Sequence, residues 1–280
     1  MLLILKPKNK HYLWQNFSFM QEILNVALLQ ANLVWENKTE NLKAFDLKLK
    51  ALSGRKLDLI VLPEMFTTGF SMDAVRLAER GNYNPTLAWM KTKSFEYDAA
   101  LCGSFIVEEN GQYFNRLHWV QPNGTVLTYN KRHLFTLAGE HENYTAGTEK
   151  LIVEWKGWKI CPLICYDLRF PVWSRNTENY DLLIYIANWP NRRIHAWKTL
   201  IAARAIENQS YCIGVNIVGT DPNGNLYNGE SCAVNCEGHV LYEKKNEIDV
   251  KLLALDATSQ ANFRQKFPFL KDQDSFLTKF

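Results

Sequence analysis

The sequence predicts an α/β fold organised around a mixed β-sheet. Short apolar runs typical of buried strands alternate along the chain with segments whose apolar residues recur at helical spacing. Turn signals between neighbouring apolar runs, at 122–125 (PNGT) and at Gly157, predict hairpins and therefore antiparallel strand pairs beside the parallel ones. The predicted strands are numerous enough for two sheets that pack face to face.

The N-terminal half alternates buried strands with helices. Strands are predicted where apolar residues run together, at 24–33, 57–62, 99–107, 112–121 and 126–130. Helical spacing of apolar residues predicts helices at 37–52 and 73–92. The polar, glycine-containing stretch 132–148 that follows predicts a loop, and a loop of this length in a compact domain is usually functional.

The C-terminal half continues the same alternation. Apolar runs predict strands at 151–155, 158–164, 181–187, 211–218, 230–235 and 239–242. Glycines between the first two and between the last two of these runs predict hairpins. A helix is predicted at 193–208, and the tail from Ala257 onward is expected to be partly helical.

The chain is interpreted as one domain with a preceding segment. Residues 1–19 lack a clear hydrophobic period and end before a second methionine, Met20, where the regular pattern begins. We interpret 1–19 as an N-terminal extension, and a misassigned start codon would explain it. Residues 20–280 contain no linker rich in Gly, Ser or Pro and are expected to form a single domain with a C-terminal tail.

Composition indicates no nucleic-acid or membrane partner. The formal net charge is +3 without a basic block, and no apolar stretch approaches the roughly 20 residues of a membrane helix. Four apolar residues near the N-terminus are fewer than a secretory signal needs, so a cytoplasmic location is expected. The six cysteines include no C-x-x-C pair, which favours neither a disulfide framework nor a zinc site.

Three reactive side chains follow predicted strands directly. Glu64 comes after the strand that ends near Leu62, Lys131 follows the strand 126–130, and Cys165 follows the strand 158–164. α/β folds place ligands at such strand ends. A thiolate nucleophile, a carboxylate base and an ammonium that stabilises an oxyanion would together form a hydrolase site. Taken singly, each residue also fits a structural role, as a core thiol, a capping carboxylate or a surface lysine.

Three motifs resemble the nitrilase, or carbon–nitrogen hydrolase, superfamily and occur in that family's order. These are 62–70 (LPEMFTTGF), 129–135 (YNKRHLF) and 163–171 (LICYDLRFP), and 203–209 (ARAIENQ) is similar to a helix shared in the superfamily. The resemblance extends from about Leu24 to about Leu255. It implies a four-layer α-β-β-α sandwich of two mixed sheets and a face-to-face homodimer, with neither metal nor organic cofactor.

The resemblance also implies a mechanism and a substrate class. Strings such as 139–144 (GEHENY) and 187–190 (ANWP) are similar to the omega-amidase branch, whose members cleave the terminal amide of 2-oxo acids such as 2-oxoglutaramate. A second active-site glutamate is expected at Glu140, with Glu142 as the alternative. Cys165 would attack the amide, and Lys131 with the Tyr166 backbone N–H would hold the oxyanion.

The substrate-binding residues follow less directly from the motifs. Trp189 is a candidate pocket wall, and the candidates for binding the substrate carboxylate are cationic or titratable residues near the motifs: Arg169, Arg192, Arg193 and His133. Nitriles, N-carbamoyl compounds and simple aliphatic amides remain alternative substrates. A thiol-protease pair of His133 and Cys165 and a non-catalytic binding protein are further alternatives, which the three ordered motifs disfavour.

Overall fold

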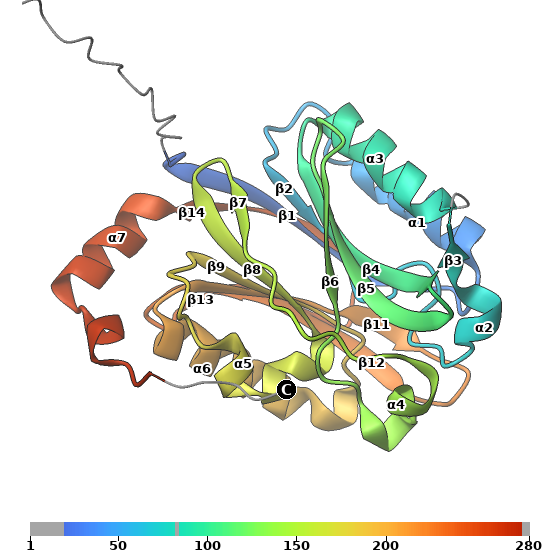
Figure 1. Ribbon diagram of the computed structural model, residues 1–280. Coiled ribbons are helices and arrows are strands. Elements are labelled where there is room, and N and C mark those ends of the chain that lie inside the picture. Colours follow the sequence, from blue (N-terminus) through green and yellow to red (C-terminus); the bar gives the residue numbers. More distant parts are fainter. Residues whose placement is uncertain (1–19, 82–83, 276–280) are drawn as a thin grey trace, which may run out of the picture.

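The computed structural model describes residues 20–81 and 84–275 (Figure 1). The predicted extension at 1–19 lies outside the described residues. Within the described ranges, no helix is both long enough and apolar enough to cross a membrane.

The first sheet contains the N-terminal strands in the order β6-β5-β4-β2-β1, with β14 on the other side of β1. Strands β1, β2 and β4 are parallel, whereas β5, β6 and β14 pair in antiparallel fashion. The sheet is therefore mixed, as the turn signals predict. Its strands are β1 (Ile23–Asn32), β2 (Leu59–Val61), β4 (Ala100–Glu109), β5 (Gln112–Val120), β6 (Val126–Asn130) and β14 (Asp249–Asp256), with the short β3 (Glu79–Arg80) beside β4.

The second sheet has the strand order β7-β8-β9-β10-β12-β13. Its central strands β8, β9 and β10 are parallel, and β7, β12 and β13 are antiparallel to their neighbours. The predicted hairpins around Gly157 and Gly238 are its β7–β8 and β12–β13 pairs. The strands are β7 (Val153–Trp155), β8 (Trp158–Ile164), β9 (Leu182–Ile186), β10 (Tyr211–Val215), β12 (Leu226–Val234) and β13 (Val240–Lys245).

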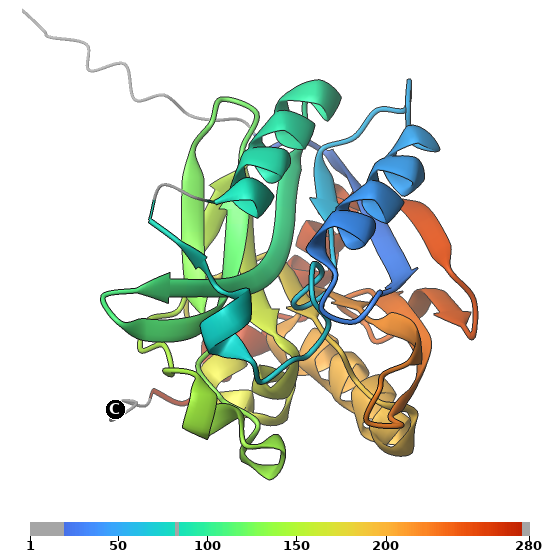
Figure 2. The same cartoon turned by 90° about the vertical axis from the view of Figure 1, so that its right-hand side faces the viewer.

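Helices cover the outer faces of the two sheets (Figures 1 and 2). Successive side chains of a strand point to opposite faces of its sheet. The side chains of β1 therefore show which layer lies on each face. Val26 and Leu28 belong to the core shared with the second sheet, whereas Ala27 and Leu29 belong to the core beneath α1 (Lys38–Lys50) and α3 (Pro85–Tyr97). On the other side, α6 (Ile194–Asn208) packs against β10 and β12. The predicted order of layers, α-β-β-α, is confirmed.

One strand joins the two sheets into a continuous hydrogen-bonded ladder. The sequence predicted a single strand at 211–218, but the structure divides it at Asn216 into β10 and β11 (Ile217–Thr220). Strand β11 pairs in parallel with β1, where Ala31 lies opposite Ile217, and in antiparallel fashion with β12. The described strands thus form one nearly closed 14-stranded sheet.

Three further local features differ from the prediction. The helix predicted at 73–92 is interrupted: a short α2 (Ala74–Leu77) precedes β3, and α3 starts afresh with Pro85 in its first turn, where proline is favoured. Strand β14 was missed, although it pairs with β1 over eight residues. The loop 132–148 contains a 3₁₀ turn and the short α4 (Glu140–Asn143). The C-terminal tail is partly helical as expected, because α7 (Ala257–Lys266) follows β14. A further short helix, α5 (Pro171–Ser174), lies between β8 and β9.

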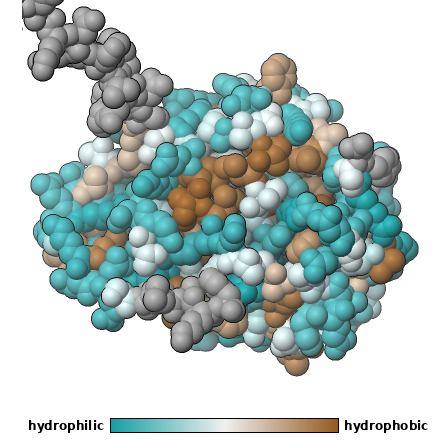
Figure 3. All heavy atoms as spheres, viewed as in Figure 1, coloured by the Kyte–Doolittle hydropathy of each residue, from teal (hydrophilic) through white to brown (hydrophobic). Residues whose placement is uncertain are grey.

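The surface of the face drawn in Figure 1 is largely hydrophilic. Figure 3 shows a band of hydrophobic residues across the upper middle of this face. The band lies near β6 and β7, the two ends of the ordered path of strands in the described sheet.

The contact between α6 and β10 predicts the effect of one substitution. A Cβ atom at Gly214 would lie 2.4 Å from Cδ1 of Ile201 and 2.5 Å from Cζ2 of Trp197. We therefore expect Gly214→Ala to lower the free energy of unfolding by about 1–3 kcal/mol, measured by urea denaturation. The control Val75→Ala, at a side chain 66% exposed, should change it by less than about 0.5 kcal/mol. Equal stability of Gly214→Ala and the wild type would contradict this packing.

Candidate active site

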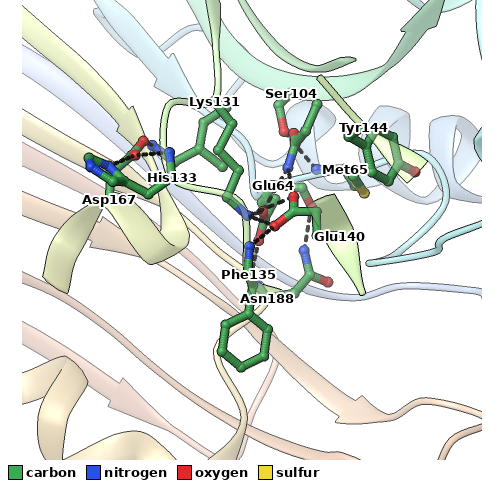
Figure 4. Close-up of polar contacts among 12 residues, drawn as sticks. Glu64, Met65, Ser104, Lys131, His133, Phe135, Glu140, Tyr144, Asp167 and Asn188 are labelled. Carbon is green, nitrogen blue, oxygen red and sulfur yellow. Dashed lines mark hydrogen bonds and ion pairs between the residues drawn. The ribbon is translucent and has the colours of Figure 1, made fainter. Parts of the chain in front are cut away.

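The structure brings the predicted glutamates and lysine together at the ends of the strands (Figure 4). Nζ of Lys131 lies 2.8 Å from Oε1 of Glu64 and 2.9 Å from both carboxylate oxygens of Glu140. All three side chains are fully buried. The ammonium therefore lies between two carboxylates in a site without water contact.

Hydrogen bonds from neighbouring groups satisfy the buried carboxylates. Nδ2 of Asn115 donates to Oε1 of Glu64 at 2.8 Å and to Oε1 of Glu140 at 3.3 Å. The backbone N–H of Asn188 donates to Oε2 of Glu64 at 2.9 Å, and that of Phe135 donates to Oε2 of Glu140 at 2.6 Å. Buried ions are tolerated when they are paired and their remaining lone pairs are filled, which is the case here.

Cys165 occupies a sharp turn directly after β8. Its φ is +45°, in the left-handed region that side chains other than glycine rarely adopt, and a 3₁₀ helix (Cys165–Arg169) begins at the same residue. Strained backbone of this kind is concentrated at functional sites. Cys165 is partly exposed and lines a cavity, whereas the other five cysteines are buried. The turn thus directs the thiol into the cavity rather than into the core.

Asp167 links the cysteine turn to the lysine segment. Its carboxylate accepts hydrogen bonds from the Tyr129 hydroxyl at 2.8 Å and from the backbone N–H of His133 at 3.0 Å. It also accepts from the backbone N–H of Ile164 at 3.0 Å. Tyr129 and His133 lie two residues before and two residues after Lys131, so these bonds set the position of the lysine relative to the thiol.

The charges in the site determine which groups carry protons. Burial raises the pKa of the Cys165 thiol well above its ordinary value of 9.0, and the Glu64 carboxylate, which accepts a hydrogen bond from the thiol, raises it further. Burial alone would lower the pKa of Lys131, but Glu140 and Glu64 outweigh it and raise that pKa. Burial raises the pKa of Glu140. The resting site therefore holds a neutral thiol beside a charged lysine, and the thiolate must form by proton transfer.

The cavity at Cys165, here called the thiol cavity, is lined by aromatic and cationic side chains. The predicted substrate-binding residues Tyr166, Trp189 and Arg192 line it, as do Arg169 and Arg193. The Arg169 guanidinium lies 5.1 Å from the centre of the Trp189 ring. None of the three arginines pairs with a carboxylate among the residues that the structure describes. Their positive charge is therefore available to a bound anion.

Two residues considered in the sequence analysis lie outside the site. His133 is away from the thiol cavity, and Glu142 is away from the buried cluster of Glu64, Lys131 and Glu140. The imidazole of His133 stacks on Phe170, with ring centres 3.7 Å apart, and its Nδ1 lies 2.8 Å from Asp167. His133 is not among the residues that line the thiol cavity. Glu142, the alternative to Glu140, has a side chain that is 72% exposed. Among the described residues, no group of three or more His, Cys, Asp and Glu is arranged to hold a metal ion.

Sequence reasoning missed the residues that hold the charged cluster together. Asn115 lies inside the predicted strand β5, where a buried amide among apolar neighbours was the available signal. Asn188 lies in the motif 187–190 that is similar to omega-amidases, but its role was not predicted. Asp167 lies in the cysteine motif 163–171, but its role was not predicted. Each acts through hydrogen bonds to residues distant in the chain, which a pattern of local spacing does not show.

Comparison with known proteins identifies the family of the chain. The family model for carbon-nitrogen hydrolases matches residues 25–262. The chain belongs to the carbon–nitrogen hydrolase family. It is 46% identical over 255 residues to the omega-amidase YafV of Yersinia enterocolitica, a match that covers 91% of this chain and 98% of that protein.

Further members of the family show the same relationship. The chain is 31% identical over 251 residues to the 2-oxoglutaramate amidase of Bacillus subtilis, which covers 88% of this chain and 96% of that protein. Among solved structures, it is similar to XC1258 from Xanthomonas campestris, a CN-hydrolase superfamily protein with an arsenic adduct in its active site. That comparison has a TM-score of 0.90 and 40% identity, and it covers 92% of this chain and 100% of the other.

The charges around the thiol predict opposite effects of two substitutions. Alkylation by iodoacetamide follows the thiolate population, so its pH midpoint reports the pKa of Cys165. Because Glu64 raises this pKa and Lys131 lowers it, we expect Glu64→Gln to move the midpoint to lower pH and Lys131→Met to move it to higher pH. Mass spectrometry of the labelled peptide would assign the signal to Cys165. Equal midpoints in the two variants would contradict the electrostatic account.

Proposed function

We propose that the protein is an amidohydrolase that cleaves the terminal amide of ω-amides of 2-oxo dicarboxylic acids, such as 2-oxoglutaramate, to the acid and ammonia. The observation that carries the proposal is a thiol, hydrogen-bonded to a buried carboxylate, in a cavity whose arginines have no carboxylate partner among the described residues. Relatives named omega-amidase YafV and 2-oxoglutaramate amidase support the same substrate class.

The substrate enters with its amide at the thiol and its carboxylate toward the arginines. Arg169, Arg192 and Arg193 line the same cavity as Cys165, and guanidinium groups bind carboxylates through paired, charge-assisted hydrogen bonds. Trp189 forms one wall and is fixed by hydrogen bonds from its backbone N–H to Asn216 at 2.7 Å and from its indole N–H to the Arg193 carbonyl at 2.8 Å. Binding the distal carboxylate thus holds the amide in place for attack.

Acylation begins with transfer of the thiol proton to Glu64. The Cys165 thiolate then attacks the amide carbon, and the Lys131 ammonium with the Tyr166 backbone N–H stabilises the oxyanion. Each such donor typically contributes about 10²–10³ in rate. The tetrahedral intermediate collapses, Glu64 returns the proton to the nitrogen, ammonia leaves and a thioester to Cys165 remains.

Deacylation uses the same side chains, with water in place of the thiol as the attacking group. Glu64, or Glu140 beside it, removes a proton from a water molecule that attacks the thioester. Lys131 stabilises the second oxyanion, and the acid leaves as the thiol is restored. The two carboxylates share one ammonium, so a proton that moves onto either changes the charge seen by the other.

The assembly and location are part of the proposal. We infer a homodimer in the cytoplasm, formed by residues 20–280 as one domain. A partner copy would bury apolar surface, and the hydrophobic band in Figure 3 is a surface of this kind.

Replacing the nucleophile tests the mechanism. We expect Cys165→Ala to reduce ammonia release from 2-oxoglutaramate by at least about 10³-fold, because no other group can form the acyl intermediate. The matched control is Cys161→Ala in the preceding strand β8, whose buried thiol has a pKa raised to about 12 by burial and does not line the thiol cavity. It should retain activity within a few-fold. Normal ammonia release by Cys165→Ala, with an unchanged circular dichroism spectrum, would refute the mechanism.

Substitutions of the arginines test the orientation of the substrate. Loss of a charge-assisted hydrogen bond costs about 1.5–3 kcal/mol, so alanine at the arginine that binds the carboxylate should raise KM for 2-oxoglutaramate roughly 10–150-fold. The KM for a neutral amide such as butyramide should stay within about two-fold. Arg169, Arg192 and Arg193 are tested singly, with Arg80→Ala as a surface control. If all three variants bind both substrates as the wild type does, the carboxylate lies elsewhere.

A further inference from the structure

A second cavity adjoins the thiol cavity. Three residues line both of them: Phe70, Asn188 and Tyr227. The volume of the second cavity is about 240 Å³, against about 60 Å³ for the thiol cavity. It therefore has room for a group the size of an aromatic ring, and it adjoins the thiol cavity at the three shared side chains.

The lining of the second cavity differs in character from that of the thiol cavity. Its walls include Trp35, Ile217 and Val218, and no arginine or lysine is among its described lining residues. Among the lining residues that the structure describes, the charged one is Asp221, whose carboxylate accepts hydrogen bonds from Tyr227 at 3.0 Å and from Asn225 at 2.8 Å. A surface of apolar and uncharged polar side chains with a single negative charge favours an uncharged group and disfavours a carboxylate.

The shared wall lies on the Glu64 side of the thiol. Asn188 donates its backbone N–H to Oε2 of Glu64 at 2.9 Å and its Nδ2 to the Glu64 carbonyl at 2.6 Å. In the proposed mechanism Glu64 protonates the departing nitrogen, so that nitrogen faces Glu64. The carboxylate of the acyl part lies among the arginines of the thiol cavity. A substituent on the amide nitrogen would therefore extend toward the second cavity.

We propose that the second cavity is a subsite for an apolar group on the amide nitrogen, so that the enzyme also cleaves secondary ω-amides. This inference rests on the proposed function and specifies the leaving group. The Cys165 thiolate forms the C–S bond, the C–N bond breaks, and Glu64 delivers the thiol proton to the nitrogen. A primary amine leaves in place of ammonia, and water then hydrolyses the thioester to the same acid.

The outer end of the second cavity provides a separate exit for this amine. Asn32, Thr220 and Pro222 line it and are exposed, whereas Ile217 and Val218 are buried deeper inside. A released amine can therefore reach solvent without passing the arginines, which would hold the acyl part and repel an alkylammonium ion.

The test compares two substrates that share one acid. The primary ω-amide of 2-oxoglutarate and its N-benzyl derivative are assayed separately, by ammonia release and by benzylamine release. We expect kcat/KM for the N-benzyl amide to lie within about ten-fold of that for the primary amide, because an open apolar subsite accommodates the ring.

Filling the second cavity should separate the two activities. In Ile217→Trp the indole would occupy the space, so kcat/KM for the N-benzyl amide should fall by at least about ten-fold while that for the primary amide stays within about two-fold. Ile217→Val is the matched control and should leave both values within about two-fold. Since Ile217 is buried, Thr220→Trp at the exposed rim provides a second obstruction that does not disturb the core.

The outcomes distinguish this inference from the proposed function. Cleavage of the primary amide without cleavage of the N-benzyl amide would overturn the subsite and leave the proposed function intact. Equal losses for both substrates in folded Ile217→Trp and Thr220→Trp would also overturn it. Failure to cleave either amide would refute the proposed function, and the subsite with it.

Discussion

The Lys131 ammonium between two buried carboxylates is the interaction on which the site depends. Glu64, Lys131 and Glu140 are each removed from water, and leaving any one of them unpaired would cost about 3–5 kcal/mol. The cluster therefore persists only while β2, β6 and α4 keep their relative positions. In the proposed mechanism, it supplies a fixed positive charge and a fixed base beside the thiol, so little reorganisation is needed during reaction.

The rest of the fold holds this cluster beside Cys165. The cluster itself belongs to the first sheet and its connections, whereas Cys165 and Asn188 follow strands of the second sheet. Two sets of contacts join the halves near the site: Asp167 binds both sides of the lysine segment, and β11 pairs with β1 and β12 at once. Burial and Glu64 raise the pKa of the Cys165 thiol, so the proposed mechanism requires Glu64 to take its proton.

Most of the secondary structure was predictable, and the failures have physical reasons. Buried strands and the helix α6 were found because burial imposes a hydrophobic period of 2 or 3.6 on the residues themselves. Strand β14 (DVKLLALD) was missed because its mostly half-buried face weakens the period, and its pairing with β1 is set by residues more than 200 positions away. The break at Asn216 was missed because the residue bonds to Trp189 and Gly229, which no local pattern records.

The sequence by itself determined the layers of the fold, the family and the identity of Glu64, Lys131 and Cys165 as candidates, because ordered motifs and periodicity are written in neighbouring residues. Tertiary structure decided which glutamate meets the lysine: Glu140 is buried beside it, and Glu142, two positions on, is exposed. It also decided that His133 faces Asp167 rather than the thiol cavity, and that a second cavity adjoins the first. These outcomes depend on distances between elements far apart in the chain, which only packing sets.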